Sequence, residues 1–270
     1  MERDKKISIV MAAVGFALTE LFLLFEWVLY QNGVFGEGTQ MTLIDVACRL
    51  GFGIVAISVL AGFYRKRFGG LFTHSVSRIT WILLTPVWLN LLSYGVYLIP
   101  AESVTGEFAG IFLMVCVQQL ATGFLEEATA RGVMMSGFLG RKDRLSFRLA
   151  AVIGSGVIFG LAHVTNFLFG GDIVESLWQG LFTAAWGMFM AAIYLVSENL
   201  GLMMALHALW DIVVRVPGNF INLPGGENGL LIGLDVFQTA IELVVMPVMA
   251  VLICVNYDKW TSGSRTTAAK

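Results

Sequence analysis

Residues 121–140 read ATGFLEEATARGVMMSGFLG. Apart from Glu126, Glu127 and Arg131, the side chains of this stretch are small or apolar. A helix that crosses a bilayer needs about 20 mainly apolar residues, and this stretch meets that requirement. Charged groups are costly inside a bilayer, so the few that occur there usually face the interior of a helix bundle and mark function. The stretch therefore predicts a membrane helix that carries part of a buried polar site.

The composition of the whole chain agrees with a membrane location. Of its 270 residues, 57% are hydrophobic and 13% charged, and the mean hydropathy is +0.78. Soluble domains carry about 25% charged residues, so the sequence predicts an all-α polytopic membrane protein that forms one domain over residues 1–270. The net charge of −2 says nothing about nucleic-acid binding, and the sequence has no basic tract that would indicate it, so no nucleic-acid partner is expected. The three cysteines fall in apolar segments, which predicts buried thiols and no disulfide framework.

Apolar segments of sufficient length predict a bundle of about eight transmembrane helices. The charged N-terminus runs directly into the first of them without a small-residue cleavage site, so we expect that span to be retained. The motif-bearing core is expected at about 108–217, and a flexible tail at 260–270. The expected spans are 7–30, 42–63, 79–100, 108–139, 149–169, 176–196, 200–217 and 230–256.

The basic residues predict the orientation of the spans. Cytoplasmic loops are enriched in Lys and Arg. With eight spans and a cytoplasmic N-terminus, all but three of the 17 Lys and Arg residues fall in inner segments, and none falls in an outer loop. Both termini are therefore expected in the cytoplasm. The remaining three basic residues lie within spans: Arg49, Arg131 and Arg215.

Ionisable residues within the spans fall into two groups. Asp45 and Arg49 are four residues apart on one helix face, which predicts a structural pair. Three other spans each carry a polar motif with the same four-residue spacing, so the two members of each motif share a helix face. The three pairs are Glu127 with Arg131, Phe159 with His163, and His207 with Asp211.

The adjacent glutamates are expected to have different roles. On a helix of 3.6 residues per turn, Glu126 and Glu127 point about 100° apart. Arg131 is placed to neutralise Glu127, which leaves Glu126 free to face another helix. At 1.5 Å per residue, Glu126 and His163 both lie roughly 22 Å from the cytoplasmic ends of their spans. A buried carboxylate that meets two imidazoles is either a metal site or an acid/base site.

The three motifs together resemble those of the CPBP intramembrane proteases, a family that includes the CAAX proteases and is also labelled Abi. In this sequence they read Glu126-Glu127-Ala128-Thr129-Ala130-Arg131, Phe159-Gly160-Leu161-Ala162-His163 and His207-Ala208-Leu209-Trp210-Asp211. The chain is similar to the type II CAAX prenyl endopeptidases but has Asp211 where those enzymes have Asn. An aspartate can donate a hydrogen bond only when it is protonated, so an oxyanion-binding role for this position is in question.

The resemblance implies an intramembrane endopeptidase that uses an activated water molecule, in a cavity open to the cytoplasm. Glu126 would be the general base and His163 would orient the water. His207 would donate to the oxyanion, with Asp211 setting its tautomer or sharing that role. Arg131 would support the site through Glu127, and Phe159 would pack it.

Alternatives remain open at the level of sequence. A zinc-dependent peptidase would use His163, His207 and Asp211 as ligands, with Glu126 acting on the metal-bound water, but the sequence has no His-Glu-x-x-His helix and no cofactor is expected. A non-enzymatic bacteriocin-immunity or accessory protein of the same family is a further possibility, and so is a proton-relay transporter. The expected partners are a peptide or membrane-protein substrate and the lipid bilayer, in a bacterial cell membrane.

Overall fold

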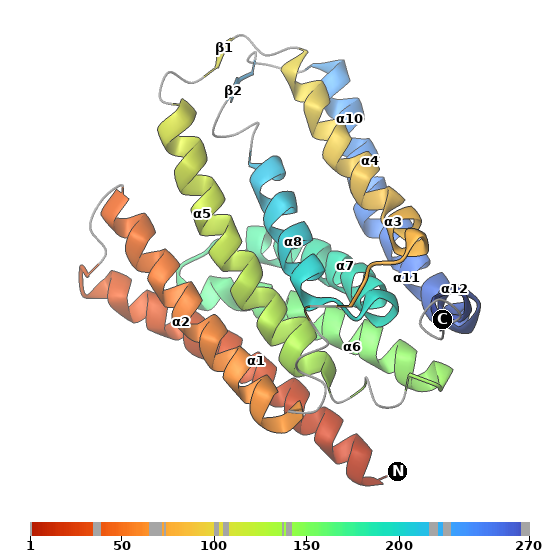
Figure 1. Ribbon diagram of the computed structural model, residues 1–270. Coiled ribbons are helices and arrows are strands. Elements are labelled where there is room, and N and C mark those ends of the chain that lie inside the picture. Colours follow the sequence, from red (N-terminus) through yellow and green to blue (C-terminus); the bar gives the residue numbers. More distant parts are fainter. Residues whose placement is uncertain are drawn as a thin grey trace.

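The computed structural model describes residues 2–34, 39–64, 72, 74–99, 103–104, 108–136, 138, 142–215, 221–223 and 228–265. Within these residues the chain is almost entirely helical, as Figure 1 shows. The prediction of an all-α polytopic protein is confirmed. Several of the basic residues used to predict the orientation lie outside the described residues: Arg65, Lys66, Arg67, Arg141 and Lys270.

The helices follow one another with short connections. The first half of the chain forms α1 (Glu2–Gln31), α2 (Thr39–Tyr64), α3 (Arg78–Leu83), α4 (Thr85–Tyr94), the 3₁₀ turn η2 (Gly95–Leu98), α5 (Phe108–Glu127) and the π-helix η3 (Ala128–Met134). The second half forms α6 (Leu145–Val164), the 3₁₀ turn η5 (Thr165–Phe169), α7 (Ile173–Ser197), α8 (Leu200–Val214), α10 (Gly229–Ala240), the π-helix η6 (Ile241–Val245), α11 (Met246–Val255) and α12 (Tyr257–Arg265). Two short strands, β1 (Ser103–Val104) and β2 (Ile221–Asn222), pair antiparallel.

Six helical segments of the described chain are long and apolar enough to cross a membrane: Ile9–Gln31, Leu43–Gly62, Ala109–Met134, Leu145–Phe169, Ile173–Ser197 and Gly229–Val255. The other two predicted spans are helical but differ from the expectation. The span at 79–100 is broken at Leu84, between α3 and α4, where Pro86 stands in the first turn of α4 and has no backbone N–H to donate. The span at 200–217 is the shorter helix α8.

The predicted flexible tail is helical in its first part. Helix α12 extends to Arg265, whereas the sequence predicted a flexible segment from residue 260. Trp260 packs against the main hydrophobic core, and the carboxylate of Asp258 pairs with Arg148 on α6 at 3.5 Å. These contacts hold the start of the expected tail against the bundle. Residues 266–270 lie outside the described residues.

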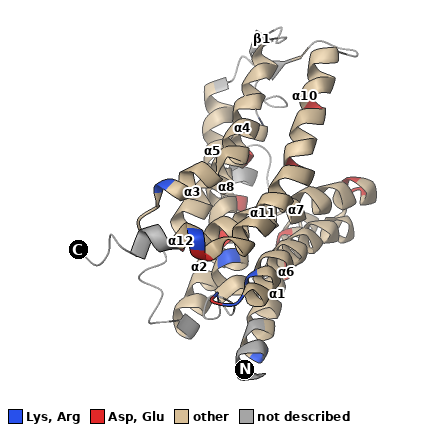
Figure 2. Cartoon of the chain, turned by 90° about the vertical axis from the view of Figure 1, so that its right-hand side faces the viewer, with Lys and Arg blue, Asp and Glu red and all other residues tan. Residues whose placement is uncertain are grey.

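The helix ends define two faces of the bundle (Figure 1). We call the side at which α1 begins and α7 and α11 end the terminal face, because the first helix begins and the last helix, α12, lies there. The opposite side, where α1 ends, α5 and α7 begin and β1 pairs with β2, is the strand face. In Figure 2 many of the Lys and Arg residues gather near the N-terminus, α3 and α12, whereas acidic residues lie along α10 and at the far end of α7.

The half of the bundle next to the terminal face is solidly packed. Residues 189–195 of α7 are all at most 1% exposed, and every residue of η3 is buried. Met246, Ala250 and Ile253 of α11 pack into the same hydrophobic core. The cavity that is lined by Glu126, His163 and His207 therefore lies in the half next to the strand face.

Glycines allow α6 and α7 to approach closely. A Cβ atom added at Gly160 would collide with the carbonyl oxygen of Gly180 on α7, and one added at Gly156 would lie 2.6 Å from the backbone nitrogen of Met188. Small residues at such positions let membrane helices pack backbone to backbone. The close contact fixes the end of α6, which carries His163.

The substitution Gly160→Val is therefore expected to push α6 away from α7. Overpacking of a tight contact costs about 1–3 kcal/mol, which should appear as a lower thermal unfolding midpoint in detergent. Gly154→Val is the matched control, because it lies on the same helix and a Cβ atom there would meet nothing within 4 Å. Equal melting of the two variants would contradict this account of the α6–α7 contact.

Candidate active site

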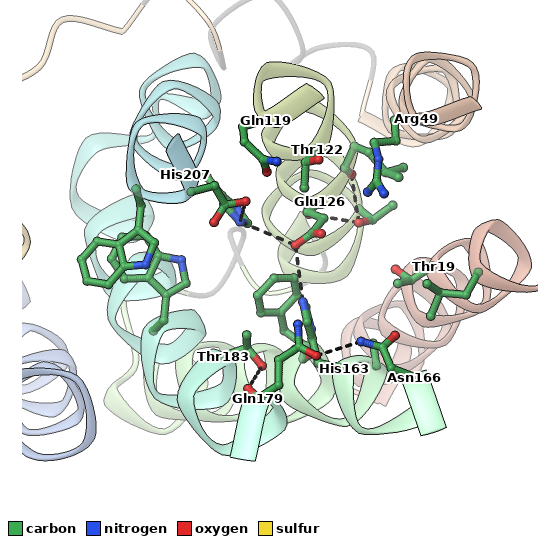
Figure 3. Close-up of a pocket in the computed structure, with 18 of the residues that line it drawn as sticks. Thr19, Arg49, Gln119, Thr122, Glu126, His163, Asn166, Gln179, Thr183 and His207 are labelled. Carbon is green, nitrogen blue, oxygen red and sulfur yellow. Dashed lines mark hydrogen bonds and ion pairs between the residues drawn. The ribbon is translucent and has the colours of Figure 1, made fainter. Parts of the chain in front are cut away.

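One carboxylate from α5 lies between two imidazoles from α6 and α8 (Figure 3). Glu126 Oε2 is 3.8 Å from His163 Nε2 and 3.6 Å from His207 Nε2. The structure thus brings together the three groups that the sequence singled out from separate spans. Both distances exceed those of direct hydrogen bonds, and they leave room for a water molecule or a reacting group to contact both atoms from one side.

The two adjacent glutamates diverge as expected. The Glu126 side chain is 18% exposed and lines a cavity. The Glu127 side chain is completely buried, and its Oε1 accepts a hydrogen bond from Arg131 Nη1 at 2.8 Å. Arg131 also donates from Nη2 to the carbonyl oxygen of Gly187 on α7 at 3.1 Å. The predicted Glu127–Arg131 pair therefore exists, and it joins α5 to α7.

Glu127 has a second contact that the sequence did not reveal. His207 Nδ1 donates to Glu127 Oε1 at 2.7 Å, because a carboxylate oxygen in this pair can only accept. The tautomer of His207 is therefore set by Glu127. Asp211, for which the sequence suggested this role as one alternative, has its Oδ2 3.7 Å from the other ring nitrogen, Nε2.

The orientation of His163 is fixed by its own helix. Its Nδ1 donates to the carbonyl oxygen of Phe159 at 2.9 Å. In the neutral imidazole the other nitrogen, Nε2, then carries a lone pair, and this atom faces Glu126. The Phe159 ring meets the His163 ring edge-on, with centroids 4.7 Å apart, and lies beneath the Arg131 guanidinium at 5.1 Å. Phe159 thus packs both the imidazole and the buried ion pair.

Gln119 is a site residue that the sequence analysis missed. With its amide in the orientation that satisfies both neighbours, its nitrogen donates to Asp211 Oδ2 at 2.9 Å and its oxygen accepts from Arg215 Nε at 3.1 Å. Its position two helical turns before Glu126 was the available signal, because residues seven apart share a helix face. Gln119 therefore holds the carboxylate of Asp211 next to His207.

A π-helix follows the glutamates directly. The backbone widens from Ala128 to Met134, and Arg131 lies within this segment. Short π-helical segments inside α-helices occur often at functional sites. Here the wider turn begins immediately after Glu127 and carries the guanidinium that this carboxylate binds.

The site lines a cavity of about 390 Å³. Glu126, His163, His207 and Asp211 form part of its wall, together with the aromatic rings of Phe159, Phe182, Trp186 and Trp210. A second cavity of about 430 Å³ adjoins the first. The two share Leu23, Glu26, Arg49, Gln118 and Asn166 in their linings.

A second polar cluster lies where these two cavities meet. Arg49 Nε donates to Asp45 Oδ1 at 2.7 Å, which is the predicted pair, and Arg49 Nη2 reaches Glu26 Oε1 at 3.3 Å. Gln118 donates to the other oxygen of Asp45 at 2.7 Å. The cluster thus links α1, α2 and α5 beside the cavity.

The geometry also bears on the zinc alternative. Within the described part of the chain, no group of three or more His, Cys, Asp or Glu side chains has the arrangement of a metal site. The Nδ1 atoms of His163 and His207 are bound to a carbonyl oxygen and to Glu127, which leaves only their Nε2 atoms for any further ligand.

These features define a polytopic membrane protein with a buried carboxylate–imidazole site of the kind that hydrolases use. Residues 108–213, which contain all three motifs, match the model of a family described as Rce1-like: type II CAAX prenyl endopeptidase Rce1-like. No curated protein and no solved structure matches the chain. The family match confirms the resemblance to the CPBP group of CAAX proteases and supports an intramembrane protease of the CAAX type.

Proposed function

We propose that the protein is an intramembrane endopeptidase in which Glu126 and His163 activate a water molecule. The observation that supports this proposal is the position of Glu126 Oε2 between the Nε2 atoms of two histidines, at the wall of a cavity. A water molecule beside Glu126 and His163 could donate one hydrogen to the carboxylate and the other to the imidazole lone pair. Its own lone pair would then be free to attack a carbonyl carbon.

The protons balance through Glu126. As the water oxygen bonds to the carbonyl carbon, Glu126 takes a proton from the water, and the electron pair of the C=O bond moves to the oxygen. When this tetrahedral intermediate collapses, the C–N bond breaks and Glu126 gives the proton to the departing nitrogen. The products are a new carboxyl end and a new amino end, and the carboxylate returns to its initial state.

His207 is the proposed stabiliser of the oxyanion. Its Nδ1 is held by Glu127, so Nε2 can donate only when the ring is the doubly protonated imidazolium. The carboxylates of Glu126 and Asp211, 3.6 and 3.7 Å from Nε2, are the counter-charges of that ion. A charged donor preorganised beside a developing negative charge is among the strongest contributions to catalysis.

A direct test compares hydrolysis with transport. Purified protein in detergent would be incubated with internally quenched fluorogenic peptides, and reconstituted vesicles would be assayed for solute or proton uptake. We expect peptide cleavage that depends on Glu126. Uptake without cleavage would favour the transporter, and neither activity would favour the immunity or accessory role.

The proposed reaction requires no metal ion. Purified protein is expected to contain no stoichiometric zinc and to keep its activity after dialysis against a strong chelator. Metal analysis by mass spectrometry, together with assays before and after chelation, measures this. One zinc ion per chain, with activity lost on chelation and restored by zinc, would instead make His163 and His207 metal ligands.

A further inference from the structure

The cavity lies close to the strand face of the bundle. Glu26 is near the end of α1, His163 is in the last turn of α6, and Asp211 is in the last turn of α8. Arg49 and Gln179 line the cavity from the first halves of α2 and α7, which begin at the same face. Five helices therefore line the cavity with the parts of them that lie next to the strand face.

The second cavity extends the first toward the same side. It reaches Tyr30 at the end of α1, and Phe169 and Gly171 after α6, which are all strand-face residues. In the opposite direction the space ends at Glu126 and Thr129, because the residues beyond them in η3 and in 189–195 of α7 are buried in the hydrophobic core. Access to Glu126 is therefore from the strand face.

The charge pattern assigns this face to a side of the membrane. Cytoplasmic segments are the ones enriched in Lys and Arg. The described segments at the terminal face carry the basic residues Lys6, Arg78, Lys142, Arg144, Arg148 and Lys259. With the terminal face in the cytoplasm, the cavity opens away from it. The two expectations of cytoplasmic termini and a cytoplasmic opening are thus incompatible in this structure, because the face at which α1 begins and α12 lies is opposite the opening.

We propose that the peptidase takes its substrate from the non-cytoplasmic side of the membrane, through the passage between α1, α2 and the end of α6. This inference rests on the proposed function and names the substrate class: a peptide segment exposed at, or anchored in, the outer leaflet. The passage is lined by Arg49, Gln118 and Glu26, which hydrogen-bond to one another or to Asp45, and a guanidinium, an amide and a carboxylate each have further donor or acceptor positions. An extended peptide, which carries unpaired N–H and C=O groups, fits such a lining.

Sided membrane vesicles test the proposal. Right-side-out and inside-out vesicles containing the protein would be given a pool of quenched peptides that carry sulfonated dyes and do not cross bilayers. We expect cleavage by right-side-out vesicles and none by intact inside-out vesicles until detergent is added. Cleavage by inside-out vesicles, alone or equally with the other preparation, would overturn the inference while leaving a Glu126-dependent peptidase in place.

Cysteine modification provides a second readout that does not need activity. In a variant in which Cys48, Cys116 and Cys254 are replaced by alanine, Asn166→Cys places a thiol in the passage, and Asp143→Cys places one at the terminal face, where the native side chain is 70% exposed. A bulky impermeant maleimide added to intact cells is expected to label Asn166→Cys and block its cleavage of the peptides. It is expected to label Asp143→Cys only after permeabilisation.

The labelling also separates the two hypotheses. Labelling of Asp143→Cys in intact cells, or of Asn166→Cys only after permeabilisation, would overturn the proposed sidedness whatever the activity. Labelling in the expected pattern, combined with no peptide cleavage by wild-type protein even in detergent, would support the opening on the outer side and would overturn the proposed function.

Discussion

Replacing Glu126 with glutamine is expected to abolish peptide hydrolysis and to leave the fold intact. Glutamine keeps the size of the side chain, but its amide cannot take a proton from water at neutral pH. Loss of a general base typically lowers the rate by about 10²- to 10⁴-fold. Because the side chain lines the cavity and its ion-pair partners among the described residues are the two histidines, the free energy of unfolding should change little. Steady-state kcat and thermal unfolding in detergent measure both effects.

Glu242 offers a matched control for this substitution. It lines the same cavity from η6, where its carboxylate accepts a hydrogen bond from Asn90 at 2.8 Å, and no ion pair links it to His163 or His207 in the described structure. Glu242→Gln is therefore expected to keep most of the activity. Full activity in Glu126→Gln, or an equal loss in both variants, would remove Glu126 from the role of base.

Replacing Glu127 with glutamine is expected to destabilise the protein and to lower its activity. The substitution leaves the guanidinium of Arg131, which is 1% exposed, without its counter-charge, and breaking a buried pair in this way costs about 3–5 kcal/mol. It also removes the charged acceptor of His207 Nδ1. Chemical unfolding and kcat should therefore both change, whereas Glu126→Gln changes kcat alone.

A double variant separates the two roles of Glu127. In Glu127→Gln combined with Arg131→Met, the unpaired charge is gone, so we expect much of the stability to return. The activity should stay low, because His207 still lacks its carboxylate partner. If Glu127→Gln alone is as stable and as active as the wild type, the buried pair is unimportant for both stability and activity.

The sequence predicted the parts of the fold and site that depend on local spacing. Apolar segment lengths indicated the helices, and the four-residue spacings of Glu127 with Arg131 and of Asp45 with Arg49 indicated pairs that the structure contains. Such spacing places two side chains on one face of one helix, whatever the rest of the chain does. Contacts within a helix are therefore accessible from sequence alone.

Contacts between helices were harder to predict. The bond of His207 to Glu127, and that of Gln119 to Asp211, depend on how α5 and α8 are rotated against each other, which no local pattern encodes. His163 was expected roughly 22 Å from the start of its span, and the structure places it in the last turn of α6, which ends at Val164. With the proposed orientation, in which the terminal face is cytoplasmic, this depth favours an opening on the opposite side over the expected cytoplasmic opening.

The packed half of the bundle has a consequence for the permeability of the membrane to protons and ions. A hydrolase inside a bilayer must admit water, and a continuous water path would let protons and ions leak down their gradients. Between Glu126 and the terminal face, residues 189–195 of α7 are at most 1% exposed and the η3 segment is buried. Close packing of mainly apolar side chains excludes water and therefore blocks ion passage. In the proposed peptidase the site would thus take up water from one side without making the membrane permeable.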